Sequence, residues 1–469
     1  MKPVLLLTDA LIYLLLVLAV GFAVYAARHA HLREPWGRVG RSRVGVAALV
    51  VLGFYFVIGL LDTAHFHPSE DAPGESGETV YSPEVLSLLD LWLSPLRERQ
   101  EKTYSAPFAT HLYAKESVEL PDGRVTRDYP RLRWGGSHLD DPQEDKAADI
   151  LWVALRGVVA GLVCWALAAA LVLRFLAWRS GKGFRWTYEA VRAGRTSIPW
   201  RTALLTLGLM LALSFVAGEL AVKYHILGTD KVGEDVFYQG LKSIRTGLVI
   251  GTLTTLIMLP AAILLGIMAG YFRGLADDII QYVYTTLNSI PSVLLIAAAI
   301  LMLQIYMTNH EADFASLVER SDLRLLFLCI ILGVTSWTGL CRLLRGESLK
   351  LREVDYVQAA VSLGVSHSTL IGRHILPNVL HIVLISVVLD FSGLVLAEAV
   401  LSYINIGVDP TMNSWGNMIN SARLELAREP MVWWSLATAF LFMFTLVLFA
   451  NLLADVVRDA FDPRLRGSR

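Results

Sequence analysis

The chain has 469 residues, of which 55% are hydrophobic and 18% are charged. Soluble domains hold about 45–50% apolar and about 25% charged residues, so this composition excludes an ordinary soluble protein. The formal net charge of −1 carries no information about partners. The three cysteines, Cys164, Cys329 and Cys341, lie in or beside apolar runs, which indicates neither a disulfide framework nor a thiolate metal site.

The apolar runs are long enough to cross a bilayer, which takes about 20 helical residues. They predict nine membrane spans, at about 4–27, 44–62, 149–176, 200–222, 245–270, 276–303, 324–343, 379–402 and 431–452. No small-residue cleavage site follows the first run, so we expect a retained helix rather than a signal peptide. The pattern therefore predicts a polytopic, all-α membrane protein.

Basic residues gather in four of the segments that join or follow these spans. They are residues 28–43, residues 177–199, the loop after residue 343 and the C-terminal tail. With nine spans, all four lie on one side if the N-terminus is outside, and the positive-inside rule makes that side cytoplasmic. We therefore expect the loop 344–378 in the cytoplasm and residues 63–148 outside.

Residues 63–148 are too long for a simple connector. Val118 to Trp134 alternates around Pro121-Asp122-Gly123, a hairpin turn signal, so we expect a small extracytoplasmic domain with some strand. Four side chains near the start of this segment are of types that can bind a metal; they are Asp62, His65, His67 and Glu70. Their spacing matches no defined site, so we expect a solvated loop and no metal.

The loop 344–378 has internal order. From Tyr356 to Leu363 there is no helix breaker, and apolar residues recur at positions 357, 360, 361 and 364. This spacing predicts one face of a short helix. Gly364 is expected to end that helix, and Pro377 to mark the boundary before the next apolar run.

This pattern resembles the EAA loop of ABC-importer permeases, in which Glu-Ala-Ala-x3-Gly is followed by Ile/His-x-Leu-Pro. Gln358 replaces the family's Glu, which the peptide-type permeases tolerate. The resemblance implies that the short helix docks on a cytoplasmic ATPase and passes its motion to the membrane helices. The residues that it assigns to this coupling are Asp355, Tyr356, Gln358, Ala359, Ala360, Gly364, His374 and Pro377.

A second stretch, Leu227 to Phe237, resembles a segment of the C-type permease subunits of dipeptide and oligopeptide importers. Physically it is a turn followed by a helix start, in which Thr229 and Asp230 offer caps and Asp235 suits the helix dipole. Glu234 stands where the family usually has Arg, so no role of that arginine is carried over. The resemblance implies an outer entrance formed by Gly228, Thr229, Asp230, Gly233 and Asp235.

Two acids, Asp390 and Glu398, lie inside an apolar run that resembles the family's fifth core helix. Acids at membrane depth are costly and usually face a bundle interior or a water-filled path. Because they are eight residues apart, both project toward nearly the same face. They are candidates for the translocation path or its gate, together with Trp415 and Asn417 in a stretch that resembles the family's outer loop. A hydrogen-bonded helix contact, or an interfacial position for Glu398, is the alternative for the two acids.

The resemblance covers residues 200–466, about half of the chain, as six spans. It implies a six-span type I ABC-importer permease core, preceded by about three extra spans and a small mixed extracytoplasmic domain. We expect four parts: two N-terminal spans (1–62), the outer domain (63–148), a third span with a cytoplasmic linker (149–199), and the permease core with its coupling loop (200–469).

The resemblance implies a permease subunit of an ATP-driven importer in the bacterial inner membrane, most simply for di- or oligopeptides. The chain has no Gly-x4-Gly-Lys-Ser/Thr phosphate loop, so ATP and magnesium are expected on partner subunits and no cofactor on this chain. The implied partners are a second, B-type permease, two ATP-binding subunits and an extracytoplasmic binding protein; no nucleic-acid partner is expected. An ion-driven secondary transporter, or a membrane sensor or assembly protein with a degenerate permease core, remains the alternative.

Overall fold

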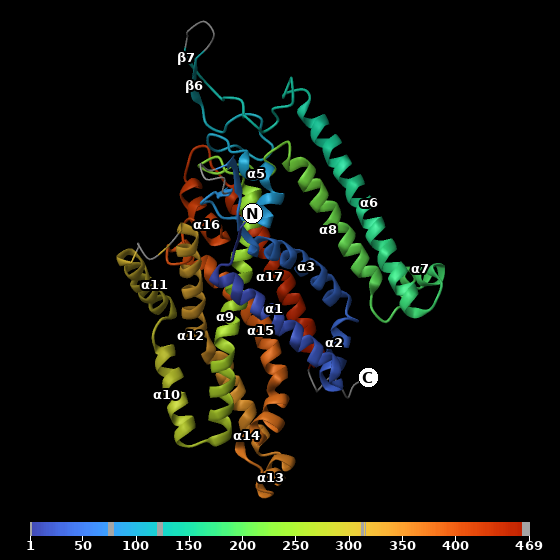
Figure 1. Cartoon of the computed structure of the whole chain (residues 1–469), viewed down its shortest axis with the longest axis vertical. Helices are drawn as coiled ribbons and strands as arrows, with labels where there is room; N and C mark the ends of the chain where they lie inside the picture. Colours follow the sequence, from blue (N-terminus) through green and yellow to red (C-terminus); the bar gives the residue numbers. More distant parts are fainter. Residues whose placement is uncertain (1, 74–78, 120–124, 311–313, 315, 462–469) are drawn as a thin grey trace. The chain divides into compact units, whose positions relative to one another are not determined.

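The computed structural model describes residues 2–73, 79–119, 125–310, 314 and 316–461 (Figure 1). Within these residues, nine helices are long and apolar enough to cross a membrane, as predicted. The chain divides into two compact units. The first comprises Met1–Val4, Gly37–Thr246 and Asn413–Phe449, and the second Leu5–Trp36, Gly247–Met412 and Ala450–Arg469.

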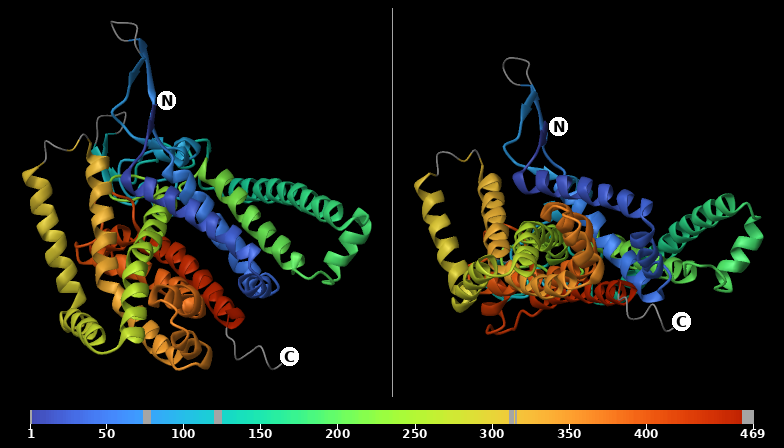
Figure 2. Two further views of the ribbon diagram at one scale, coloured as in Figure 1. Left: turned by 60° about the horizontal axis from the view of Figure 1, so that its bottom comes forward. Right: turned by 90° about the horizontal axis from the view of Figure 1, so that it is seen from below.

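The spans of the first unit include α3 (Arg43–Thr63), α6 (Lys146–Ser180) and α8 (Trp200–Ala221), with the short helix α7 (Phe184–Arg192) between the last two. Helices α6 and α8 lie side by side (Figure 2). A Cβ at Gly157 would lie 2.6 Å from the Val216 Cα, and one at Gly161 would lie 2.8 Å from the Ala212 Cα. Glycine therefore lets the two backbones approach closely, as in other small-residue contacts between membrane helices.

Residues 63–148 of the first unit, which are expected outside and are called the outer segment below, contain short strands and helices. Strands β1 (Lys2–Val4), β2 (His65–His67) and β5 (Leu86–Ser87) form one antiparallel sheet, followed by α4 (Leu88–Trp92) and α5 (Ser94–Glu98). Two hairpins accompany it, β3 (Ser69–Pro73) with β4 (Thr79–Tyr81), and β6 (Glu116–Glu119) with β7 (Val125–Asp128). The second hairpin confirms the expected strands, although the turn Pro121-Asp122-Gly123 lies outside the described residues.

Strand β1 corrects the expected start of the first span. Lys2 pairs with His67 and Val4 with His65, and the helix α1 (Leu7–Arg28) begins only at Leu7. Because residues 2–4 share a sheet with residues 65–67, both lie on the same side of the membrane.

The second unit contains α10 (Leu275–Ser289), α11 (Ser292–Asn309), α12 (Leu317–Arg352), α13 (Asp355–Ser362), α14 (His367–Leu370), the short π-helix η2 (Ile371–Ile375) and α15 (Leu376–Tyr403). Helices α2 (Ala30–Val39), α9 (Val236–Phe272) and α17 (Trp434–Phe461) contribute residues to both units, and α16 (Trp415–Glu425) belongs to the first.

The expected single span at 276–303 is wrong, because two helices occupy this region. Ile290 ends α10 in an extended conformation, with φ −89° and ψ 127°, and Pro291 precedes α11. A proline disfavours helical backbone at the residue before it and cannot donate a hydrogen bond, which explains the break. Only α11 of the two is apolar and long enough to count as a candidate span.

Candidate functional site: the coupling loop and the covered outer loop

The loop expected at 344–378 is shorter than predicted, because α12 continues to Arg352 and the next span begins at His367. Helix α13 fills most of the gap between them. Its Val357 is fully buried and packs in one hydrophobic cluster with Leu344, Leu370 and Ile375. One turn of α13 is thus fixed to the ends of both flanking helices, so a force on α13 reaches two spans directly.

Gly364 ends α13 as predicted, and it does so in a left-handed conformation with φ +76°. The N–H of Gly364 donates to the Val361 carbonyl at 3.0 Å, and the N–H of Val365 donates to the Ala360 carbonyl at 3.1 Å. These two bonds form a Schellman motif, which satisfies the last carbonyls of the helix. The glycine is required by the backbone conformation rather than by crowding, since a Cβ at Gly364 would meet no atom within 4 Å.

The predicted apolar face of α13 is only partly correct. Val357 is buried and Ala360 partly buried, but the Val361 side chain is 48% exposed. Leu363 is 84% exposed and Tyr356 is 44% exposed. The side of α13 away from Val357 is therefore uncovered within the described residues and mixes these apolar side chains with exposed Asp355 and Gln358, which fits a contact surface for another protein.

The other residues assigned to coupling lie around this helix. Asp355, Gln358 and Ala359 are exposed, and the Gln358 amide donates to Glu353 at 3.4 Å. The ring of His374 lies 6.0 Å from that of Tyr356. Pro377 sits in the first turn of α15 rather than at a boundary, because the helical path already begins at His367 and passes through η2. Their role in coupling stays a prediction.

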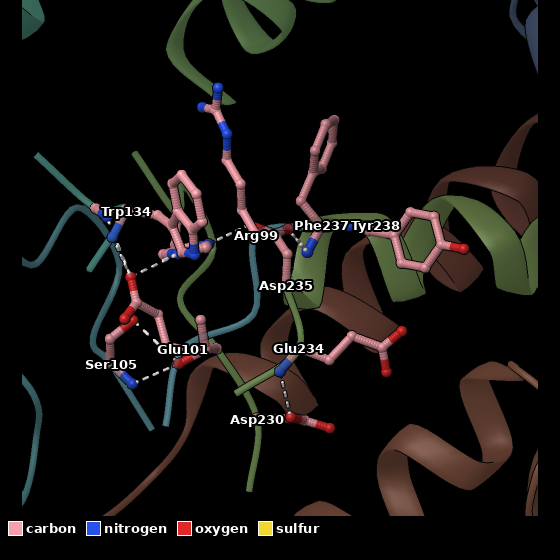
Figure 3. Close-up of polar contacts among 12 residues, drawn as sticks. Arg99, Glu101, Ser105, Trp134, Asp230, Glu234, Asp235, Phe237 and Tyr238 are labelled. Carbon is pink, nitrogen blue, oxygen red and sulfur yellow. Dashed lines mark hydrogen bonds and ion pairs between the residues drawn. The ribbon is translucent and has the colours of Figure 1, made fainter. Parts of the chain in front are cut away.

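The outer loop before α9 is covered by residues 99–136 of the outer segment (Figure 3). Thr229 is fully buried, and its N–H donates to the Ser105 carbonyl at 3.0 Å. The Thr229 hydroxyl accepts from the Ser105 N–H at 2.6 Å and donates to the Thr103 carbonyl at 2.9 Å. Trp434 also donates its indole N–H to the Thr229 carbonyl at 2.9 Å.

Capping in this loop differs from the expectation. Asp235, not Thr229, caps α9, since its Oδ1 accepts from the N–H groups of Phe237 at 2.8 Å and Tyr238 at 3.1 Å. Asp230 closes the preceding turn by accepting from the Glu234 N–H at 2.9 Å. Thr229 instead joins the loop to the outer segment.

Two glycines allow this close contact. Gly228 has φ +73° and Gly233 has φ +80°. A Cβ at Gly228 would lie 2.5 Å from the Ser105 carbonyl oxygen, and one at Gly233 would lie 1.9 Å from the Glu101 carbonyl oxygen. Both the positive φ and the approaching backbone exclude a side chain at these two positions.

A buried charge cluster joins the same two segments. His225 Nδ1 lies 2.7 Å from Asp235 Oδ2, and His225 Nε2 lies 3.4 Å from Glu101 Oε1. The side chains of His225, Asp235 and Glu101 are 5%, 1% and 3% exposed. Burial by itself lowers the pKa of His225, but the two carboxylates outweigh it and raise that pKa to about 9. His225 is therefore a cation at neutral pH.

Glu101 also organises its own side of the contact. Its carboxylate accepts from the backbone N–H groups of Arg133 at 2.9 Å, Trp134 at 2.8 Å and Gly135 at 3.2 Å. Burial raises the pKa of Glu101, but the contact with His225 and these three donors outweigh it, and the net pKa is lowered. One carboxylate thus holds a turn of the outer segment and faces the cation of the loop.

A second buried cluster connects α3, α4 and α9. Lys242 Nζ donates to Asp62 Oδ1 at 2.6 Å and to Asp90 at 2.9 Å. Ser87 donates to Asp62 at 2.6 Å, and Tyr238 donates to Asp90 at 2.7 Å. Asp62, considered above for a metal site, is therefore used in an ion pair. The side chain of Glu70, the fourth residue considered there, lies outside the described residues.

The candidate path residues have mixed placements. Glu398 is 2% exposed and accepts from the Ser402 hydroxyl at 2.6 Å, one turn further along α15, and its role stays a prediction. Asp390 is half-buried. Trp415 is 1% exposed, and its indole N–H donates to the Gly240 carbonyl at 3.1 Å, so its side chain is packed inside the chain instead of lining an open path. Asn417 lies in the first turn of α16, where its N–H donates to Ser414.

Sequence reasoning missed Glu101, His225 and Lys242. The only local signal was Lys242 and its neighbour Arg245 at the start of an apolar run, where a cation needs a partner.

Comparison with known proteins identifies the second half of the chain. Residues 262–467 match the family described as binding-protein-dependent transport system inner membrane component. The chain is 31% identical over 242 residues to the glutathione transport system permease protein GsiD of Pectobacterium atrosepticum, covering 52% of this chain and 73% of that protein. It is 30% identical over 243 residues to the oligopeptide transport system permease protein OppC of Haemophilus influenzae, covering 52% and 71%.

The dipeptide transport system permease protein DppC of Bacillus subtilis is 29% identical over 243 residues, covering 52% of this chain and 69% of that protein. The residues of this chain that match the family include α13, Gly364 and the π-helix η2. The chain therefore belongs to the family of binding-protein-dependent transport system inner membrane components: it is a multi-pass inner-membrane permease subunit of an ABC importer, and not an enzyme.

Proposed function

We propose that this permease subunit imports di- or oligopeptides. The support is the substrate class in the names of its relatives, which are permeases for glutathione, oligopeptides and dipeptides. We infer that a second, B-type permease completes the translocation path and that an extracytoplasmic binding protein delivers the substrate. The orientation that goes with this proposal has the N-terminus outside and the C-terminus in the cytoplasm.

We further propose that α13 is the coupling helix on which an ATP-binding subunit docks, with ATP and magnesium bound by two such subunits. The observation that carries this proposal is the geometry of α13. Its inner side is anchored by buried Val357 to the helices on both sides. The apolar side chains of Tyr356, Val361 and Leu363 are exposed around it, together with polar Asp355 and Gln358. A protein that binds α13 and shifts it would therefore shift both flanking helices with it. Within the described residues, no other part of the chain covers this surface.

The test is a single charge placed on the exposed face. Leu363→Glu introduces a carboxylate at a side chain that is 84% exposed, so folding of the permease should be unaffected. Burying a leucine at an interface contributes about 1.5–3 kcal/mol, so the change should weaken ATPase binding roughly tenfold to a hundredfold. Co-purification of the ATP-binding subunits and peptide-stimulated ATP hydrolysis are the two measurements.

A matched control is Val125→Glu on β7, where the valine is 66% exposed in the outer segment. This variant should co-purify with the ATP-binding subunits and hydrolyse ATP in response to peptide as the wild type does. Equal co-purification of the ATP-binding subunits with Leu363→Glu and the wild type would remove α13 as the dock. Peptide specificity is tested separately, by asking whether di- and oligopeptides, but not free amino acids, stimulate ATP hydrolysis in the reconstituted complex.

A further inference from the structure

The turn between α6 and α8 is strongly basic. Figure 2 shows α7 at the end of this helix pair. Between Asp149 and Glu219 the sequence contains a single acid, Glu189. The basic residues from position 174 to position 201 are all exposed; they are Arg174, Arg179, Lys182, Arg185, Arg192, Arg195 and Arg201. We call residues 174–201 the basic turn.

Helix α7 is amphipathic, and the hairpin covers only part of its apolar side. Thr187, Ala190 and Val191 are buried, with Val191 packed against Leu173 and Leu204 of α6 and α8. At 100° per residue, Phe184 and Tyr188 lie on one flank of this buried strip, and Trp186 on the other. These three aromatic side chains are 51%, 47% and 51% exposed.

The charged residues occupy the remaining arc of α7. Arg185 is 94% exposed, and Glu189 lies 3.7 Å from it, so this acid offsets only one of the cations. Lys182 lies over the face of Trp186, with Nζ 3.7 Å from the ring centroid. A short helix with exposed aromatic flanks, a cationic ridge and an apolar span at each end is the arrangement that lies in a membrane–water interface.

We propose that the basic turn is a binding surface for anionic phospholipid headgroups of the leaflet in which the α6–α8 hairpin ends. Charge complementarity favours a lipid phosphate, since seven exposed cations meet one acid. Exposed apolar side chains continue along the adjoining ends of the spans; they are Leu171, Phe175, Trp178 and Leu205. A protein bound to this surface would contact only the charged arc of α7 and would leave these apolar side chains in the lipid. The proposal is independent of peptide transport.

The test titrates the full chain, in a neutral detergent, with phosphatidylglycerol and, separately, with phosphatidylcholine. The readouts are the melting temperature and the lipid retained in native mass spectrometry. Phosphatidylglycerol should stabilise the wild type and phosphatidylcholine should not. The triple variant Lys182→Gln, Arg185→Gln, Arg192→Gln should require at least tenfold more phosphatidylglycerol for the half-maximal effect, because each cation near an anionic surface contributes about fivefold.

The matched control removes three exposed cations elsewhere, with Lys115→Gln, Arg127→Gln and Lys231→Gln, and should behave as the wild type. Glu189→Gln removes the single acid and should tighten phosphatidylglycerol binding several-fold, which tests the surface without removing any cation. A triple variant that responds to phosphatidylglycerol as the wild type does overturns the proposal. If that variant also co-purifies with less of its ATP-binding subunits than the wild type, the surface is a protein dock.

Discussion

Replacing Glu101 should release the outer segment from the loop before α9. Glu101→Ala removes the anion that faces His225 and leaves the N–H groups of Arg133, Trp134 and Gly135 without their acceptor. Breaking a buried pair by removing one partner costs about 3–5 kcal/mol. Glu101→Gln should cost less, about 1–3 kcal/mol, because its amide oxygen can still accept from Trp134 and Gly135 while its amide nitrogen faces one donor.

The assay is hydrogen exchange of the backbone amides in peptides covering residues 99–136 and 223–236. A loss of about 3 kcal/mol corresponds to a hundredfold or greater increase in opening, so exchange at positions 133–135 should accelerate by that factor in Glu101→Ala. Glu116→Gln is the matched control, since Glu116 forms a surface pair with exposed Lys102 that is worth at most about 1 kcal/mol. Exchange in Glu101→Ala within threefold of the wild type would refute the reasoning.

Three further predictions concern the same contacts and α13. Because the pKa of His225 is raised from 6.5 to about 9, its stabilising charge is fully present below about pH 6.5 and is lost as pH rises toward 9. The protection of amides in residues 99–136, relative to their intrinsic exchange rates at each pH, should fall over that window, and His225→Gln should abolish this fall. Lys242→Met leaves two buried carboxylates uncompensated and should lower stability by about 3–5 kcal/mol, measured as a loss of melting temperature. Gly364→Val, with a side chain at φ +76°, should cost about 1–2 kcal/mol and reduce ATPase co-purification and uptake, whereas Gly346→Ala, within α12 and in open space, should not.

The sequence alone predicts the membrane spans, because every backbone polar group of a helix within a bilayer must form its hydrogen bond inside that helix. A long apolar run is therefore a helix whatever surrounds it. The same local logic predicted α13 and its glycine cap, which involve residues within ten positions of each other. Pro291 was a local signal for the break between α10 and α11. The prediction of a single span overlooked it, because the residues on both sides of the proline are apolar.

The buried charge clusters were not readable for a different reason. Glu101 and His225 are 124 positions apart, and so are Ser105 and Thr229. A side-chain pair at such separation depends on the register of two segments, which no local periodicity reports. The sequence shows only that residues 63–148 are polar and that Lys242 stands at the start of an apolar run. The partner of each charge follows from the packed structure alone.

The placement of these charges says how the outer segment relates to the permease. A loosely attached segment would be joined by exposed ion pairs, each worth at most about 1 kcal/mol and screened by salt. Instead Glu101 and Asp90 are buried, and each meets a partner in residues 225–242, which include the stretch Leu227 to Phe237 that resembles a segment of C-type permeases. A buried charge that loses its partner costs several kcal/mol, so separating the two segments would leave buried charges unpaired at that cost. The outer segment is therefore part of the folded permease. It covers Thr229 and Gly233, whereas Lys231 and Val232 between them stay exposed.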